Sequence, residues 1–81
     1  MARVGVVGTT SWGTTLGILM ARRGHEVTIL ARSEKEAREL VRDQENKRLL
    51  PGVGFPPSLT ATSDIATATT NASLLILCTP S

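Results

Sequence analysis

The chain has 81 residues, a formal net charge of +2 and one cysteine. This length allows one small domain, and so small a net charge does not indicate a nucleic-acid partner. One cysteine excludes an internal disulfide, and no apolar run is long enough to cross a bilayer, so we expect a cytoplasmic protein without a membrane span.

The first third of the chain alternates strand and helix patterns. Residues 2–7 form a short, β-branched apolar run that predicts a buried parallel strand. A helix follows, for which we expect Ser11 as the N-cap and Gly24 as the stop signal. Its apolar side chains fall at helical spacing: Leu16, Leu19 and Met20. Residues 27–30 predict the second strand.

A second helix is predicted after Ser33, because Ser33 and Glu36 have the spacing of a capping box. One apolar stripe follows on that helix: Ala37, Leu40 and Val41. From Gln44 the pattern breaks, and the prolines and glycines of residues 51–57 predict a connecting loop.

The last third repeats the alternation more weakly. Residues 59–62 are a short strand candidate, and a threonine-rich helix is expected from about Asp64 to Asn71 with Ser63 as its cap. Residues 74–78 predict a fourth, strongly apolar strand.

This order predicts an α/β fold, a doubly wound parallel sheet of about four strands arranged βαβα, loop, βαβ. Ligands of such sheets bind at the carboxyl ends of the strands, where Gly8, Arg32 and Thr79 fall. The apolar strand at the end of the chain needs cover on both faces, so we expect residues 1–81 to be the first part of a longer protein.

The turn from Gly8 to Gly13 has the spacing of the dinucleotide-binding motif G-x-G-x-x-G, placed between a strand and a helix. Gly8 allows the sharp turn, and Gly13 allows the helix to approach the sheet. The backbone N–H groups of Ser11 and Trp12 are expected to face a pyrophosphate. A tight turn that binds nothing would have the same pattern.

Thr10 stands where the motif has its middle glycine. Its β-branched side chain adds bulk near the pyrophosphate, and a strained φ there would cost about 1–3 kcal/mol. Its hydroxyl, on the other hand, is able to donate to a phosphate. For Trp12 two positions stay open, packed under the turn or along the edge of the cofactor.

Arg32 and Ser33 occupy the place where NAD-selective folds carry an acid that binds the ribose 2′-hydroxyl. A guanidinium group there is suited to a 2′-phosphate, which favours NADP and leaves NAD open. The alternative is an exposed arginine beside a helix start. His25 and Cys78 lack partners at metal-ligand or catalytic spacing, so we predict no metal site and no catalytic residue in this chain.

Several motifs together resemble the bacterial NAD(P)-dependent glycerol-3-phosphate dehydrogenases over the whole chain. They are Gly8-x-x-Ser11-Trp12-Gly13-Thr14, Gly24-His25-Glu26-Val27-Thr28, Ala31-Arg32, Glu45-Asn46-x-Arg48-x-Leu50-Pro51-Gly52, Pro56-Pro57-x-Leu59-x-Ala61-Thr62-x-Asp64 and Thr79-Pro80-Ser81.

The resemblance implies a Rossmann-type N-terminal domain that binds NAD(P)H, with a helical C-terminal domain completing the site. The reaction it implies for the whole protein is hydride transfer between the nicotinamide and dihydroxyacetone phosphate, giving sn-glycerol 3-phosphate for phospholipid synthesis. The resemblance also implies cofactor contacts from Ser11, Trp12, Arg32 and Ser33, and a position near the nicotinamide for Thr79 and Pro80. The family's catalytic and phosphate-binding lysines would lie beyond Ser81, in a C-terminal substrate domain. A homodimer stays open.

Two residues depart from the family pattern. Thr10 replaces its usual glycine, and Leu49 stands where it commonly carries an aromatic side chain near the cofactor. The alternatives are a related ketopantoate-type or 6-phosphogluconate-type reductase and a non-catalytic nucleotide-binding module.

Overall fold

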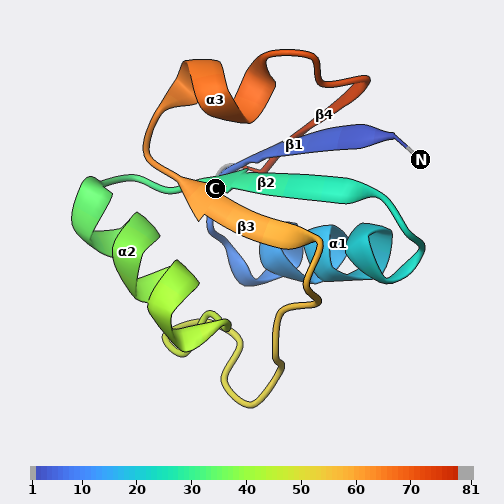
Figure 1. Cartoon of the computed structure of the whole chain (residues 1–81). Helices are drawn as coiled ribbons and strands as arrows, with labels where there is room; N and C mark the ends of the chain where they lie inside the picture. Colours follow the sequence, from blue (N-terminus) through green and yellow to red (C-terminus); the bar gives the residue numbers. More distant parts are fainter. Residues whose placement is uncertain (1, 79–81) are drawn as a thin grey trace.

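The computed structural model describes residues 2–78, and in them four parallel strands form one sheet with three helices around it (Figure 1). The elements are β1 (Arg3–Val7), α1 (Ser11–Arg22), β2 (Glu26–Leu30), α2 (Glu34–Asp43), β3 (Leu59–Thr62), α3 (Ile65–Thr69) and β4 (Leu74–Leu77). The strand order is β3-β2-β1-β4, and every pairing is parallel. The predicted α/β fold and element order are therefore confirmed.

Helices cover both faces of the sheet, as a doubly wound fold requires. Helices α1 and α2 lie on one face and α3 lies on the other (Figure 1). The chain runs outward from β1 through β2 to β3 and then returns to place β4 on the opposite side of β1. The carboxyl ends of β1 and β4 thus flank the point where the strand order reverses, which is where such sheets bind ligands.

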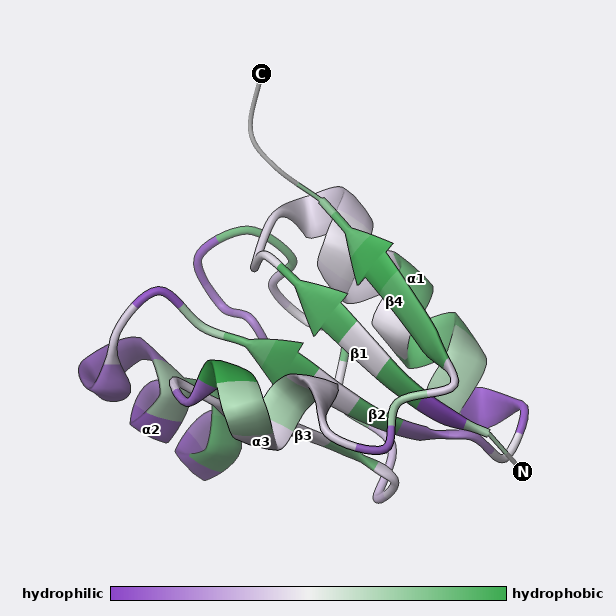
Figure 2. Ribbon diagram, turned by 90° about the horizontal axis from the view of Figure 1, so that it is seen from above, coloured by the Kyte–Doolittle hydropathy of each residue, from purple (hydrophilic) through white to green (hydrophobic). Residues whose placement is uncertain are grey.

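The core lies between the sheet and α1. Alternate strand residues and one face of α1 supply it: Val4, Val6, Val27, Ile29, Leu59, Ile18 and Ala21. Burying one such Val, Ile or Leu side chain stabilises the fold by about 1.5–3 kcal/mol. A smaller cluster joins α2 to the end of β2, and Figure 2 shows the apolar strands beside the more hydrophilic α2.

The predicted apolar stripes of the two long helices are partly wrong. On α1 the buried side is built from Gly13, Gly17, Ile18 and Ala21 with Thr14, while Leu19 is 50% exposed. The glycines bring α1 so close to the sheet that this side packs inward in place of the leucine side. On α2, Ala37 and Leu40 are buried as predicted, and Val41 is exposed.

The weak third helix is shorter than predicted and has a different cap. Helix α3 ends at Thr69, before Asn71, whose φ of 64° lies in the left-handed region. Its N-cap is Asp64, since the Asp64 carboxylate accepts from the backbone N–H of Ala66 at 3.1 Å. The second carboxylate oxygen of Asp64 accepts from the Thr67 hydroxyl at 2.8 Å, so Asp64 binds two donors of the first turn, and the cap is shifted by one residue from Ser63.

Strand β4 is paired with β1 alone among the described residues, and its leucines are largely exposed. The sequence predicted a strongly apolar strand over residues 74–78. The strand ends at Leu77, although the Cys78 backbone N–H still donates to the Val7 carbonyl at 2.9 Å. The apolar composition of β4 is that of an inner strand, but within residues 2–78 it lies at an edge.

Candidate functional site

A cavity of about 340 Å³ lies at the carboxyl ends of β1, β2 and β4. Its lining combines the turn after β1, the end of β2, one loop leucine and the residue after β4: Val7, Gly8, Thr9, Thr10, Leu30, Ala31, Arg32, Leu49 and Cys78. The cavity therefore lies where the strand order reverses, and it brings together Gly8, Thr10 and Arg32 as the sequence predicted.

Two glycines of the turn are required by its geometry. Gly8 has a φ of +122°, and a Cβ on it would collide with the carbonyl oxygen of Cys78. A Cβ on Gly13 would come within 3.0 Å of the Cys78 Cβ, so a glycine lets α1 approach the end of β4. Both roles agree with the prediction.

Thr10 is the N-cap of α1, and the prediction of Ser11 in that role is wrong. The Thr10 hydroxyl oxygen accepts from the backbone N–H of Gly13 at 3.0 Å, and Ser11 is the first helical residue. Thr10 has φ −64° and ψ 160°, an ordinary extended conformation. The expected strain is absent because the N-cap position needs this backbone geometry.

The N-terminus of α1 presents free backbone donors directly after Thr10, which lines the cavity. The first four N–H groups of a helix have no intrahelical acceptor, and here the Gly13 N–H is satisfied by Thr10. The N–H groups of Ser11 and Trp12 make no hydrogen bond with another residue of the described range 2–78. A helix of 12 residues adds a partial positive charge at this end, which suits an anion.

Trp12 is 68% exposed beside this helix end. Of the two positions left open by the sequence, packing under the turn is therefore wrong.

Arg32 lies just after β2 with its side chain 61% exposed, and its Nη2 is 3.4 Å from a carboxylate oxygen of Glu36. Ser33 is the N-cap of α2, because its hydroxyl oxygen accepts from the Glu36 N–H at 3.1 Å. The Ser33 hydroxyl proton is still available to a ligand, since it is not used by this cap.

Glu36 was missed as a site residue by the sequence reasoning, which looked for an acid only at the end of β2. Its Oε1 accepts from the Arg32 backbone N–H at 2.9 Å and from the Thr9 hydroxyl at 3.2 Å. Burial raises the pKa of Glu36, but the hydrogen bonds from Arg32 and Thr9 and the Arg32 charge outweigh it and leave the pKa below its usual value. The capping-box spacing was the available signal, because such a carboxylate reaches back past the helix start.

Asn46 is a second residue whose role the sequence did not predict. It is 5% exposed, and its side-chain Nδ2 donates to the Thr9 carbonyl and to the Thr14 hydroxyl, both at 3.0 Å. Its Oδ1 accepts from the backbone N–H of Leu49 at 3.3 Å. Asn46 thus connects the loop after α2 to the turn after β1 and places Leu49 at the cavity.

The remaining residues considered in the sequence analysis either contact other parts of the fold or lie outside the described residues. His25 Nδ1 accepts from the Ala2 N–H at 3.0 Å, and Cys78 is a free thiol at the cavity wall. Thr79 and Pro80 lie outside the described residues. Residues 2–78 contain no group of three or more side chains arranged to hold a metal, and none of their helices has the length and apolar character of a membrane span.

Comparison with known proteins gives a consistent result over the whole chain. The sequence model of the family described as NAD-dependent glycerol-3-phosphate dehydrogenase N-terminus matches residues 3–81. A relative from Prosthecochloris aestuarii named glycerol-3-phosphate dehydrogenase (NAD(P)+) is 43% identical over 76 residues, which is 94% of this chain. A relative of the same name from Agathobacter rectalis is 42% identical over 81 residues. The chain spans 23% and 24% of the lengths of these relatives.

Solved structures agree with the sequence comparison. Glycerol-3-phosphate dehydrogenase from Coxiella burnetii superposes with a TM-score of 0.88 at 26% identity, over 94% of this chain and 23% of that one. The glycerol-3-phosphate dehydrogenase structure from Saccharomyces cerevisiae has a TM-score of 0.82 at 21% identity, over 98% of this chain and 26% of that one, and supports the fold alone.

Proposed function

The chain belongs to the family of NAD-dependent glycerol-3-phosphate dehydrogenases, matching their N-terminal part, and we propose that its cavity binds NADP(H) or NAD(H). The observation that carries this proposal is the free N-terminus of α1, which follows directly on the cavity-lining Thr10. Gly8 lines the cavity in the turn before this helix. In this proposal the pyrophosphate lies along that turn, where the N–H groups of Ser11 and Trp12 donate to its oxygens. Gly13 keeps this helix end close to the sheet.

The adenosine half of the cofactor lies toward β2 in this proposal. Leu30, Ala31 and Leu49 supply the apolar part of the cavity wall for the adenine ring. The Arg32 guanidinium and the Ser33 hydroxyl bind a 2′-phosphate, which favours NADP over NAD. The exposed, weakly paired Arg32 supports this assignment, because it is free to turn toward a ligand.

For the reaction, we propose hydride transfer between the nicotinamide and dihydroxyacetone phosphate, giving sn-glycerol 3-phosphate for phospholipid synthesis in the cytoplasm. The bound cofactor supplies or accepts the hydride, and the residues of this chain bind and orient it. Thr79 and Pro80 are proposed neighbours of the nicotinamide. Since the relatives are about four times longer, the lysines that bind the substrate phosphate and transfer the proton are assigned to a further domain.

A competition experiment tests the pyrophosphate assignment. The purified protein is titrated with NADPH by calorimetry, alone and in the presence of inorganic pyrophosphate or of adenosine. Both competitors are expected to weaken NADPH binding, because each fills one part of the cavity. Absence of NADPH and NADH binding by a folded protein would contradict the proposed function. An assay of NADPH oxidation by a protein that also carries the proposed further domain tests the reaction separately, with dihydroxyacetone phosphate as substrate and unphosphorylated dihydroxyacetone as control.

A further inference from the structure

The Glu36 carboxylate contacts residues from three separate segments of the chain. It accepts hydrogen bonds from Thr9 in the turn after β1 and from the backbone of Arg32 after β2. Its Oε2 also faces two guanidinium groups, Arg32 Nη2 at 3.4 Å and Arg48 Nη2 at 3.8 Å. The Glu36 carboxylate therefore pairs with two arginines. The three side chains together, Arg32, Glu36 and Arg48, carry a net charge of +1.

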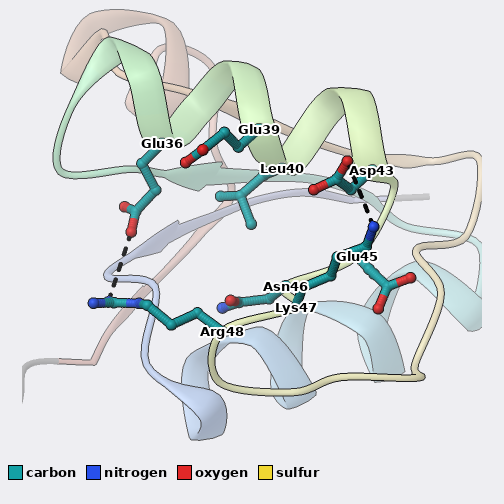
Figure 3. Close-up of a pocket in the computed structure, with 8 residues that line it drawn as sticks. All are labelled: Glu36, Glu39, Leu40, Asp43, Glu45, Asn46, Lys47 and Arg48. Carbon is teal, nitrogen blue, oxygen red and sulfur yellow. Dashed lines mark ion pairs between the residues drawn. The ribbon is translucent and has the colours of Figure 1, made fainter.

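Glu36 and Arg48 border a second hollow, of about 270 Å³, between α2 and the loop that follows it. Figure 3 shows Arg48 extending from this loop toward Glu36, with the ion pair between them. Thr9 and Arg32, which are hydrogen-bonded to Glu36, line the proposed cofactor cavity. The carboxylate thus contacts both the cavity residues and a counter-charge that lies outside the cavity lining.

We propose that Glu36 is a specificity-determining residue that sets the preference of this chain between NADPH and NADH by competing with the 2′-phosphate for Arg32. This inference rests on the proposed function. When Arg32 turns to the 2′-phosphate, Arg48 stays beside Glu36 and neutralises it, so the carboxylate does not repel the ligand. When the cofactor carries a 2′-hydroxyl, Arg32 stays with Glu36.

The chemistry supports a selective effect. A carboxylate and a phosphate use the same planar guanidinium donors, and the phosphate carries the greater charge. The exposed Arg32–Glu36 pair is a weak one, so a 2′-phosphate is able to displace it. A neutral 2′-hydroxyl gains nothing from a free Arg32, and its binding therefore depends little on the charge of Glu36.

The test removes the negative charge of Glu36 and keeps the size and shape of its side chain. Glu36→Gln retains an acceptor for the Thr9 hydroxyl and the Arg32 N–H, and it is expected to tighten NADPH binding about threefold to fivefold, the range of one exposed charge contact. NADH affinity is expected to change less than about twofold. Glu39→Gln is the matched control, because Glu39 lines the same hollow of α2 but makes no ion pair within residues 2–78; it is expected to change neither affinity.

A second variant, Arg48→Gln, removes the counter-charge and is expected to weaken NADPH binding severalfold with NADH binding unchanged. A merely structural role of either residue would change the affinities for NADPH and NADH by the same factor. The proposal is overturned if either variant leaves the NADPH-to-NADH affinity ratio within about twofold of the wild-type ratio while the wild type binds both cofactors. If the wild type binds neither cofactor, the proposed function fails instead.

Discussion

The hydroxyl oxygen of Thr10 accepts a hydrogen bond from the backbone N–H of Gly13 at 3.0 Å. The residue that departs from the glycine motif is therefore the N-cap of α1. A glycine at this position has no side chain with which to cap the helix. The turn thus gains a cap, while the N–H groups of Ser11 and Trp12 stay available for a phosphate.

Thr10→Ala is expected to lower the free energy of unfolding by about 1 kcal/mol, because it removes the cap. Thr10→Ser keeps the hydroxyl and is expected to stay close to the wild type. Urea denaturation followed by circular dichroism measures both changes. An alanine variant as stable as the serine variant would show that the cap contributes nothing.

Gly8→Ala is expected to destabilise the protein by more than about 2 kcal/mol and to abolish cofactor binding. The added methyl group collides with the Cys78 carbonyl oxygen, and φ is +122°. Gly24→Ala is the control, since Gly24 also has a positive φ, +92°, but a Cβ there meets nothing within 4 Å. It is expected to cost about 1 kcal/mol and to leave binding intact. Equal losses for the two variants, by thermal melting and calorimetry, would contradict the collision.

Asn46→Ala is expected to cost about 1–3 kcal/mol of stability, because it leaves the Thr9 carbonyl, the Thr14 hydroxyl and the Leu49 N–H without their partner. Cofactor binding should weaken as well, since Thr9 and Leu49 line the cavity. Lys47→Ala changes an exposed neighbour that lies 3.9 Å from Asp43 and is expected to be nearly neutral. Normal affinity in a folded Asn46 variant would mean that the loop does not depend on this residue.

The stability that Glu36 contributes should depend on pH. Its pKa in the folded protein lies below the ordinary 4.5, because hydrogen bonds from Arg32 and Thr9 outweigh the effect of burial. The contribution is therefore complete above about pH 4.5 and is lost as the pH falls through the folded pKa. Denaturation of the wild type and Glu36→Gln over a pH series should show a difference that is constant near neutrality and shrinks in acid. A difference that grows in acid would contradict this sign.

The fold was predictable because local signals and global order agree. Apolar runs, glycine stops and the Ser33 capping box predicted each strand and helix, and short connections then left a parallel sheet as the topology. The wrong predictions concern which side of a helix is buried and which residue caps it, and both depend on tertiary contacts. Leu19 is exposed because the glycines of α1 turn another side toward the sheet, and the helix caps shifted by one residue at Thr10 and Asp64.

The candidate site was predictable where one short motif encodes it, as at Gly8 and Gly13. It was not predictable where residues distant in sequence meet. Glu36 is 27 residues from Thr9, and Asn46 is 37 residues from it. These contacts depend on the crossing of α2 over the sheet and on the path of the following loop. A capping box and a family loop motif marked the two residues without giving their partners.

Titration of the wild type and of Arg32→Ala with NADPH and with NADH measures whether this cavity binds a dinucleotide with Arg32 at the adenosine phosphate. Calorimetry gives the affinities, and circular dichroism confirms that both proteins are folded. We expect Arg32→Ala to weaken NADPH binding by about tenfold or more, the value of a charge-assisted phosphate contact, and to change NADH binding little. Folded wild-type protein that binds neither cofactor would contradict dinucleotide binding in this cavity, and an unchanged NADPH affinity in Arg32→Ala would contradict the assignment of Arg32 to the 2′-phosphate.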